Sequence, residues 1–359
     1  MRQQKKAWAA RADLAQQALV EHYWNAELGM FDIETPCPNG ECNTIFHYWW
    51  MAHAVEALTD GLERTGDSRY SELLNALYEG LLRRNGGAWP NELYDDMEWM
   101  ALGWLRAYNA TGTEKYKQAA FLLWEDIKTG WNEHMGGGIA WQKSQLDYKN
   151  TPANAPAVIL AARLHAQFGD EADLVWAVKI YEWLKNNLVD PASGFVWDGM
   201  NRQGDGAIDK EWEFTYCQGV VIGGALELYR ATGNEAYMRD ARRTVEAAAR
   251  RLTDPATGVL PNEGKGDAGL FKGIFVRYLT QLALADPSGG GEAAKLVADN
   301  ADLLWSKGRD AERTLFGPNW SEPPGGTVEL GTQISGVILL EAAARLEAAE
   351  LTGRTEAIV

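Results

Sequence analysis

The chain has 359 residues, 46% of them hydrophobic, which is enough to bury a large core. Its formal net charge of −16 argues against binding to nucleic acid or to an anionic membrane surface, because both require a basic face. A neutral partner fits better, and the 16 Trp, 13 Tyr and 9 Phe residues supply rings of the kind that can stack on sugars.

The sequence shows no sign of membrane insertion. No apolar run approaches the roughly 20 residues of a membrane-spanning helix, and no apolar segment follows the charged start as in a signal peptide. We therefore expect a cytoplasmic protein, with secretion after removal of a leader as the alternative. Cys37, Cys42 and Cys217 are an odd number at no metal-like spacing, so they imply neither a disulfide framework nor a zinc site.

Two kinds of turn divide the chain in order. Gly-rich loops with flanking aromatic or acidic residues recur at intervals of 50 to 64 residues, marked by Gly29, Gly87, Gly137, Gly194, Gly258 and Gly317. Each interval holds two segments with apolar residues at three- and four-residue spacing, such as 46–65 and 70–84, which predicts amphipathic helices. Short Thr-Gly turns such as Thr65-Gly66 separate the two segments and are typical of helix C-caps.

A repeat of this length predicts stacked supersecondary units, here six helical hairpins. We expect an all-α fold, an (α/α)6 toroid with an inner and an outer ring of helices, as a single catalytic domain over residues 1–359. The Ala- and Gly-rich segments 151–167 and 218–232 suit the inner ring, where backbones crowd. Strands are expected only as short pieces near the Gly-rich loops, which would lie together on one rim.

Two adjacent carboxylates, Asp95 and Asp96, follow the Gly86-Gly87 turn and begin a helical segment. Aspartates there commonly accept hydrogen bonds from free N–H groups, which is the structural interpretation of the pair. Aromatic neighbours and a position on the predicted rim favour a catalytic interpretation. Two carboxyls about 5–5.5 Å apart are the arrangement of retaining glycosidases, in which one raised pKa provides an acid beside an ionised nucleophile.

Several further motifs occur one after another along most of the chain. They are Tyr94-Asp-Asp-Met-Glu-Trp99, Gly136-Gly-Gly-Ile-Ala-Trp141, Lys149-Asn150, Phe214-Thr-Tyr-Cys-Gln-Gly-Val220, Gly223-Gly-Ala-Leu-Glu-Leu-Tyr229 and Phe271-Lys-Gly-Ile-Phe-Val-Arg-Tyr278. With these motifs the sequence resembles glycoside hydrolase family 76, whose known members are endo-α-1,6-mannanases. It departs from the family at Cys217, where the family more usually has Asn.

The resemblance implies a retaining double displacement on α-mannan or manno-oligosaccharides, with Asp95 as the nucleophile and Asp96 as the general acid/base. It implies no metal and no cofactor. Ten residues are expected to hydrogen-bond or stack on sugar: Asn43, Thr44, Tyr94, Trp99, Trp141, Asn154, Tyr216, Gln218, Lys272 and Arg277. Of these, Lys272 and Arg277 could equally hold a carboxylate in place.

Other functions fit parts of the pattern. A transglycosylase on α-mannan would use the same chemistry with a sugar acceptor instead of water. Epimerases and uronyl hydrolases share the predicted fold, but an epimerase would require a pair of histidines at the site, and the sequence indicates none. A non-catalytic sugar-binding protein would keep the aromatic residues but would release no product.

Overall fold

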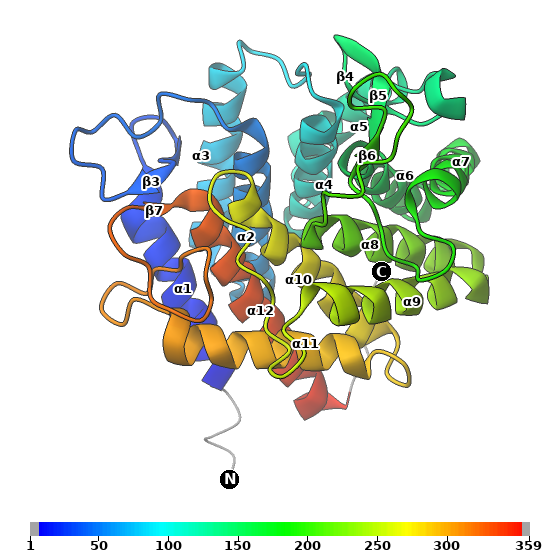
Figure 1. Cartoon of the computed structure of the whole chain (residues 1–359). Helices are drawn as coiled ribbons and strands as arrows, with labels where there is room; N and C mark the ends of the chain where they lie inside the picture. The colour runs from blue at the N-terminus through cyan, green and yellow to red at the C-terminus, as the bar shows by residue number, and fades with distance from the viewer. Residues whose placement is uncertain (1–6, 354–359) are drawn as a thin grey trace. The chain divides into compact units, whose positions relative to one another are not determined.

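The computed structural model describes residues 7–353, and most of these residues are helical (Figure 1). Short strands and turns connect the helices. The helices are α1 (Ala7–Tyr23), α2 (Tyr48–Thr65), α3 (Ser68–Arg84), α4 (Tyr94–Thr111), α5 (Glu114–Lys128), α6 (Ala155–Phe168), α7 (Glu171–Leu188), α8 (Thr215–Thr232), α9 (Glu235–Leu252), α10 (Ala268–Ala285), α11 (Gly291–Leu303) and α12 (Leu330–Thr352). None of these helices is long and apolar enough to cross a membrane.

The described residues divide into two compact units. The terminal unit comprises residues 7–88, 106–113 and 253–353, and the central unit comprises residues 89–105 and 114–252. The chain passes between the units four times: before α4, inside α4, between α4 and α5, and after α9. The prediction of a single domain stays a prediction.

Helical hairpins are the repeated element, as the sequence predicts. Consecutive helices contact each other in the pairs α2–α3, α6–α7, α8–α9 and α10–α11. In the terminal unit α12 packs against α1, so this hairpin is made from the two ends of the described chain (Figure 1). The predicted glycine caps are also present, since Gly66 ends α2 and Gly233 ends α8, each with a left-handed φ near +68°.

Small residues allow the buried helices of each unit to approach closely. In the central unit α6 packs against α8, and residues 155–162 of α6 and 215–228 of α8 are all buried, as their Ala- and Gly-rich sequences predict. In the terminal unit a Cβ on Gly273 of α10 would lie 2.7 Å from Ser335 of α12. The partners α7 and α9 leave polar side chains exposed, as expected for helices with one buried face.

The strands are short, as predicted, and pair within each unit. In the central unit β4 (Ala140–Gln142), β5 (Gln145–Asn150) and β6 (Gly199–Met200) form a three-stranded antiparallel sheet. In the terminal unit β1 (Trp24–Asn25) pairs with β2 (Met30–Phe31), and β3 (Glu34–Thr35) pairs with β7 (Val328–Glu329). The three-stranded sheet matters most here, because it carries residues that reach the start of α4.

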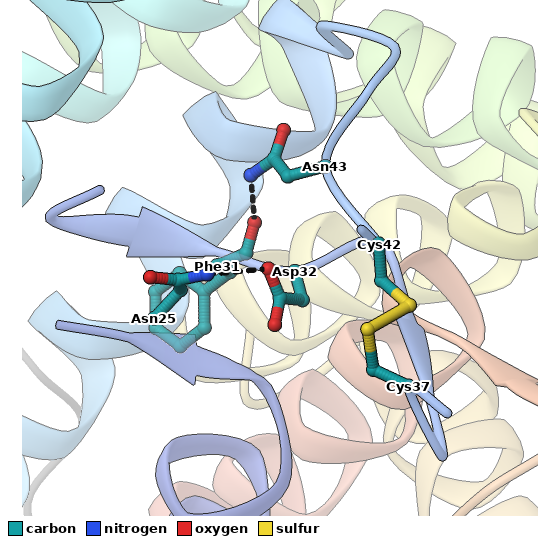
Figure 2. The surroundings of a disulfide bond; sticks show 6 residues. All are labelled: Asn25, Phe31, Asp32, Cys37, Cys42 and Asn43. Atoms are coloured by element: carbon teal, nitrogen blue, oxygen red, sulfur yellow. Dashed lines mark hydrogen bonds between the residues drawn. A yellow bond between two sulfur atoms is a disulfide. The ribbon is translucent and has the colours of Figure 1, made fainter. Parts of the chain in front are cut away.

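The cysteine prediction is wrong for two of the three residues. Cys37 and Cys42 form a disulfide with a Cα–Cα distance of 5.7 Å, which closes a short loop between β3 and α2 (Figure 2). The spacing rules applied to the sequence address metal sites and multi-bridge frameworks, and a single five-residue loop matches neither. Cys217 is a buried free thiol.

Candidate active site

The Asp95–Asp96 pair lies in the first turn of α4, which begins at Tyr94. Just before the helix, Asn91 Oδ1 accepts the Leu93 N–H at 2.5 Å, and the Asn91 amide donates to Asp96 Oδ2 at 3.1 Å. Asp96 is 7% exposed, whereas Asp95 is half-buried. The Asn91 side chain therefore fixes the residue before the helix and also holds Asp96.

Both oxygens of Asp95 accept hydrogen bonds. Oδ1 accepts the Asp96 backbone N–H at 3.0 Å, a local contact of the capping kind that the structural interpretation predicts. Oδ2 accepts the indole N–H of Trp141 at 3.2 Å, and Trp141 lies on β4, 46 residues away in sequence. The second contact does not serve the helix, so Asp95 is more than a cap.

Burial controls the protonation of Asp95. Loss of solvent raises the pKa of its carboxyl to about 7, although the N–H groups of Asp96 and Trp141 act in the opposite direction. The negative charge of Asp198 adds to the rise. A raised pKa suits the acid of a glycosidase, whereas the two N–H donors favour the ionised form that a nucleophile needs.

Asp198 is a site residue that the sequence reasoning missed. It is 3% exposed, and its Oδ1 accepts the Tyr216 hydroxyl at 3.1 Å and the Cys217 thiol at 3.5 Å. Its Oδ2 accepts the Arg202 guanidinium at 2.7 Å and the Tyr148 hydroxyl at 3.3 Å. The only available signal was an aspartate directly after the Gly194 loop, and its partners are distant in sequence.

Cys217 therefore has a defined contact. The thiol that stands in place of the family's more usual Asn points to the Asp198 carboxylate and is completely buried. A thiol is a weak donor, so it stabilises the carboxylate less than an amide would. Burial raises the pKa of Asp198, and Arg202, Tyr216 and Cys217 each lower it.

A third acid, Glu98, lies one turn after Asp95 on α4 and is completely buried. Neither of its carboxyl oxygens makes a hydrogen bond of normal geometry. Burial raises the pKa of Glu98 well above its usual value, and the charge of Asp95 raises it further, while the Ala157 backbone N–H lowers it. Burial and the charge of Asp95 thus both favour the protonated form of Glu98.

Four of the ten predicted sugar-binding residues lie near the pair in the central unit. Trp141 contacts Asp95, and the hydroxyl of Tyr216 is under the influence of the Asp95 charge. Tyr94 and Trp99 flank the pair on α4 but are only 4% exposed, and the Tyr94 hydroxyl is hydrogen-bonded to Thr129. Trp141 and Tyr216 are thus better placed than Tyr94 and Trp99 to contact a sugar at Asp95.

Two further predicted sugar-binding residues make structural contacts with the backbone, and a sugar contact for them stays a prediction. Asn154 is fully buried, and its amide exchanges hydrogen bonds with the backbone of Ile139 and also donates to the Asn150 carbonyl. Gln218 is also fully buried and bonds both the N–H and the carbonyl of Val196. Both amides fix loops next to buried helices.

The other four lie in the terminal unit, where three of them have partners of their own. Lys272 donates to the Pro318 backbone carbonyl at 2.5 Å, and Arg277 pairs with Asp60 at 2.6 Å. Arg277 therefore holds a carboxylate, which is the alternative that the sequence left open, whereas Lys272 holds a backbone carbonyl. Asn43 donates to the Phe31 carbonyl at 2.6 Å beside the disulfide (Figure 2). Thr44 is exposed, and the backbone carbonyls of both Asn43 and Thr44 accept hydrogen bonds from the Arg84 guanidinium. A sugar contact for these residues stays a prediction.

The chain is similar to known proteins over almost its whole length. The family model for glycosyl hydrolase family 76 matches residues 7–354. A solved structure of an inactive variant of the α-1,6-mannanase GH76A of Salegentibacter sp. HEL1_6, in complex with α-1,6-mannotetrose, is 43% identical and has a TM-score of 0.88. The match covers 94% of this chain and 98% of that one. A Listeria innocua protein of known structure is 41% identical with a TM-score of 0.89, covering 95% and 98% of the two chains.

A curated relative is more distant. Mannan endo-1,6-alpha-mannosidase DCW1 of Candida glabrata is 24% identical over 71% of this chain, and the chain spans 63% of that protein's length. With the solved structures, these likenesses confirm the predicted all-α, (α/α)6 fold class. In the Salegentibacter variant two adjacent aspartates have been replaced by alanine.

Proposed function

The chain belongs to glycosyl hydrolase family 76, and on this premise we propose that it hydrolyses α-1,6-linked mannose chains from within. The observation that carries the proposal is the pair of adjacent carboxylates at the start of α4, one of which is held by the Trp141 indole and titrates near neutral pH. The inactive mannanase variant that lacks two adjacent aspartates supports the same assignment.

Asp95 is the nucleophile in this proposal. Its two oxygens accept N–H groups from Asp96 and Trp141, and such donors stabilise the ionised form that attacks a sugar carbon. Attack of Asp95 on the anomeric carbon forms a covalent mannosyl-enzyme and breaks the bond to the departing oxygen.

Asp96 is the general acid/base. In the first step it gives its proton to the departing oxygen, which leaves as the hydroxyl of the shortened chain. In the second step it takes a proton from water, whose oxygen attacks the anomeric carbon and releases Asp95 as a carboxylate. Two inversions leave the product in the α configuration.

Product analysis on linear α-1,6-mannan tests this proposal. We expect a mixture of oligosaccharides at early times, because cleavage occurs within the chain, and NMR should detect the α-anomer first. Asp95→Asn should abolish turnover while the variant still binds substrate, and Asp96→Asn should lower it by about 10²- to 10⁴-fold. Early appearance of the β-anomer, or full activity of Asp95→Asn, would contradict the roles assigned here.

A further inference from the structure

Three aromatic rings form a continuous strip in the central unit, ahead of α8. Trp212, Phe214 and Tyr216 alternate along the chain, and Phe214 has an extended backbone. The ring centroids are 5.8 Å apart between Trp212 and Phe214 and 6.0 Å apart between Phe214 and Tyr216. Exposure increases from 8% at Tyr216 to 42% at Trp212, so the strip runs from the interior to the surface.

The inner end of the strip is at the candidate active site. The Tyr216 hydroxyl donates to Asp198, and the charges of Asp198 and Asp95 both act on that hydroxyl. Asp198 in turn acts on the carboxyl of Asp95. A ligand that lies along the strip would therefore extend outward from the catalytic carboxyl.

The outer end of the strip is held in place. The guanidinium of Arg202 lies over the Trp212 ring, 3.7 Å from its centroid. Arg202 also pairs with Asp198 and with Asp209, so its orientation is determined by two carboxylates. Because Asp198 also accepts Tyr216, one buried carboxylate orients both ends of the strip.

Trp212 is the most exposed tryptophan of the described residues, where the other fifteen are buried or half-buried. A single exposed apolar side chain is ordinary on a protein surface. Trp212 differs because it continues a ring-to-ring path and is pinned by a cation. A rigid aromatic face of this kind loses little conformational entropy when a ligand packs on it.

We propose that Trp212 and Phe214 form a distal subsite that binds mannose units of the substrate chain beyond those at the cleaved bond. This inference rests on the proposed function, because it assigns the strip to the same α-1,6-mannan. The C–H faces of the sugar rings would pack on the aromatic rings. This contact needs no charge on the ligand, and a neutral ligand is not repelled by a protein of net charge −16. Long chains would then bind more tightly than short ones.

The test compares α-1,6-mannohexaose with α-1,6-mannotriose on Trp212→Ala. We expect kcat/KM for the hexaose to fall about tenfold, which corresponds to about 1.4 kcal/mol, while kcat/KM for the triose changes less than about twofold. Trp212→Phe should recover most of the loss because it keeps a ring. An equal loss on both substrates, or no loss on the hexaose, would overturn the subsite.

Phe168→Ala is the matched control, since Phe168 is 38% exposed at the end of α6 and belongs to no part of the strip. It should leave both substrates unaffected. Calorimetric binding of the two oligosaccharides separates the two proposals. If the hexaose binds in a Trp212-dependent way but is not cleaved, the proposed hydrolase activity is contradicted and the subsite is supported. If the hexaose is cleaved and its cleavage does not depend on Trp212, the hydrolase activity is supported and the subsite is contradicted. Absence of both binding and turnover in the unsubstituted protein would overturn both.

Discussion

At the scale of single residues, the protonation of Asp95 depends on two opposing effects. Burial raises its pKa to about 7, and two N–H donors favour the ionised form. A nucleophile must be ionised to attack. With a pKa of about 7, Asp95 changes from the protonated to the ionised form near neutral pH.

We therefore expect kcat/KM to rise with pH along an acid limb with an apparent pKa near 7. Below that pH the Asp95 carboxyl holds a proton and cannot attack, and above it the carboxylate is present. The measurement is the pH profile of kcat/KM on an α-1,6-manno-oligosaccharide. A limb near 7 on the alkaline side instead would mean that Asp95 is the acid and that the two roles are exchanged.

Trp141→Phe tests the indole contact. The substitution removes the N–H that donates to Asp95 and keeps a ring, so the ionised form loses a stabilising partner. The acid limb should move to higher pH. Trp131→Phe is the control, because the Trp131 indole N–H has no hydrogen-bond partner and its loss should leave the profile unchanged.

At the scale of elements, glycines determine how closely α3 approaches the loop between β1 and β2. A Cβ on Gly80 of α3 would lie 2.3 Å from the Gly29 carbonyl oxygen and 2.8 Å from that of Leu28. Gly29 itself has a left-handed φ of +65°. The neighbouring atoms belong to backbone, which cannot turn aside as a side chain can.

Gly80→Ala should therefore destabilise the protein, although alanine is the better helix former. Overpacking costs about 1–3 kcal/mol, and the helix-propensity gain of about 1 kcal/mol offsets only part of it. Thermal unfolding measures the effect. Gly291→Ala at the start of α11 is the control, because a Cβ there meets no atom within 4 Å, and its melting temperature should be unchanged or higher.

At the scale of the whole molecule, the terminal unit is held by a buried ion-pair network. Arg277 of α10 pairs with Asp60 at 2.6 Å and with Glu56 at 3.2 Å, both on α2. Arg106 pairs with the same two carboxylates. Burial alone would raise the pKa of Glu56, but the two arginines lower it to about 2, and they lower that of Asp60 as well.

Arg277→Met should cost about 3–5 kcal/mol of stability, because it leaves buried carboxylates with one cation fewer. The loss should be smaller in acid. A depressed carboxyl pKa stabilises the fold above the unfolded pKa near 4, and that contribution disappears as the pH falls towards 2. Chemical denaturation at pH 7 and pH 3 measures both effects. Lys117→Ala, which breaks an exposed pair with Glu114, should change stability by less than about 0.5 kcal/mol.

The compartment stays a prediction. The Cys37–Cys42 disulfide favours an oxidising environment, since such bonds are rare in the cytosol, and it therefore favours the secreted alternative over the cytoplasmic one. Thiol labelling of the protein isolated from its native source, before and after reduction, would decide between them.

The sequence by itself determined the features that depend on near neighbours. The helices follow from apolar spacing within single segments, and the turns follow from glycines that must adopt a left-handed backbone. Asp95 and Asp96 are adjacent in the chain, so their proximity needs no long-range packing. The proximity of the two proposed catalytic residues could for that reason be predicted from the order of residues alone.

Only the tertiary structure decided which distant groups meet the pair. Trp141 reaches Asp95 from β4, and Asp198 gathers Tyr216, Cys217 and Arg202 from two further segments. The amides of Asn154 and Gln218, predicted to bind sugar, hydrogen-bond to backbone groups that packing buries beside them. A polar residue type indicates that a hydrogen bond will form, but the partner is determined by which segments the buried helices bring together.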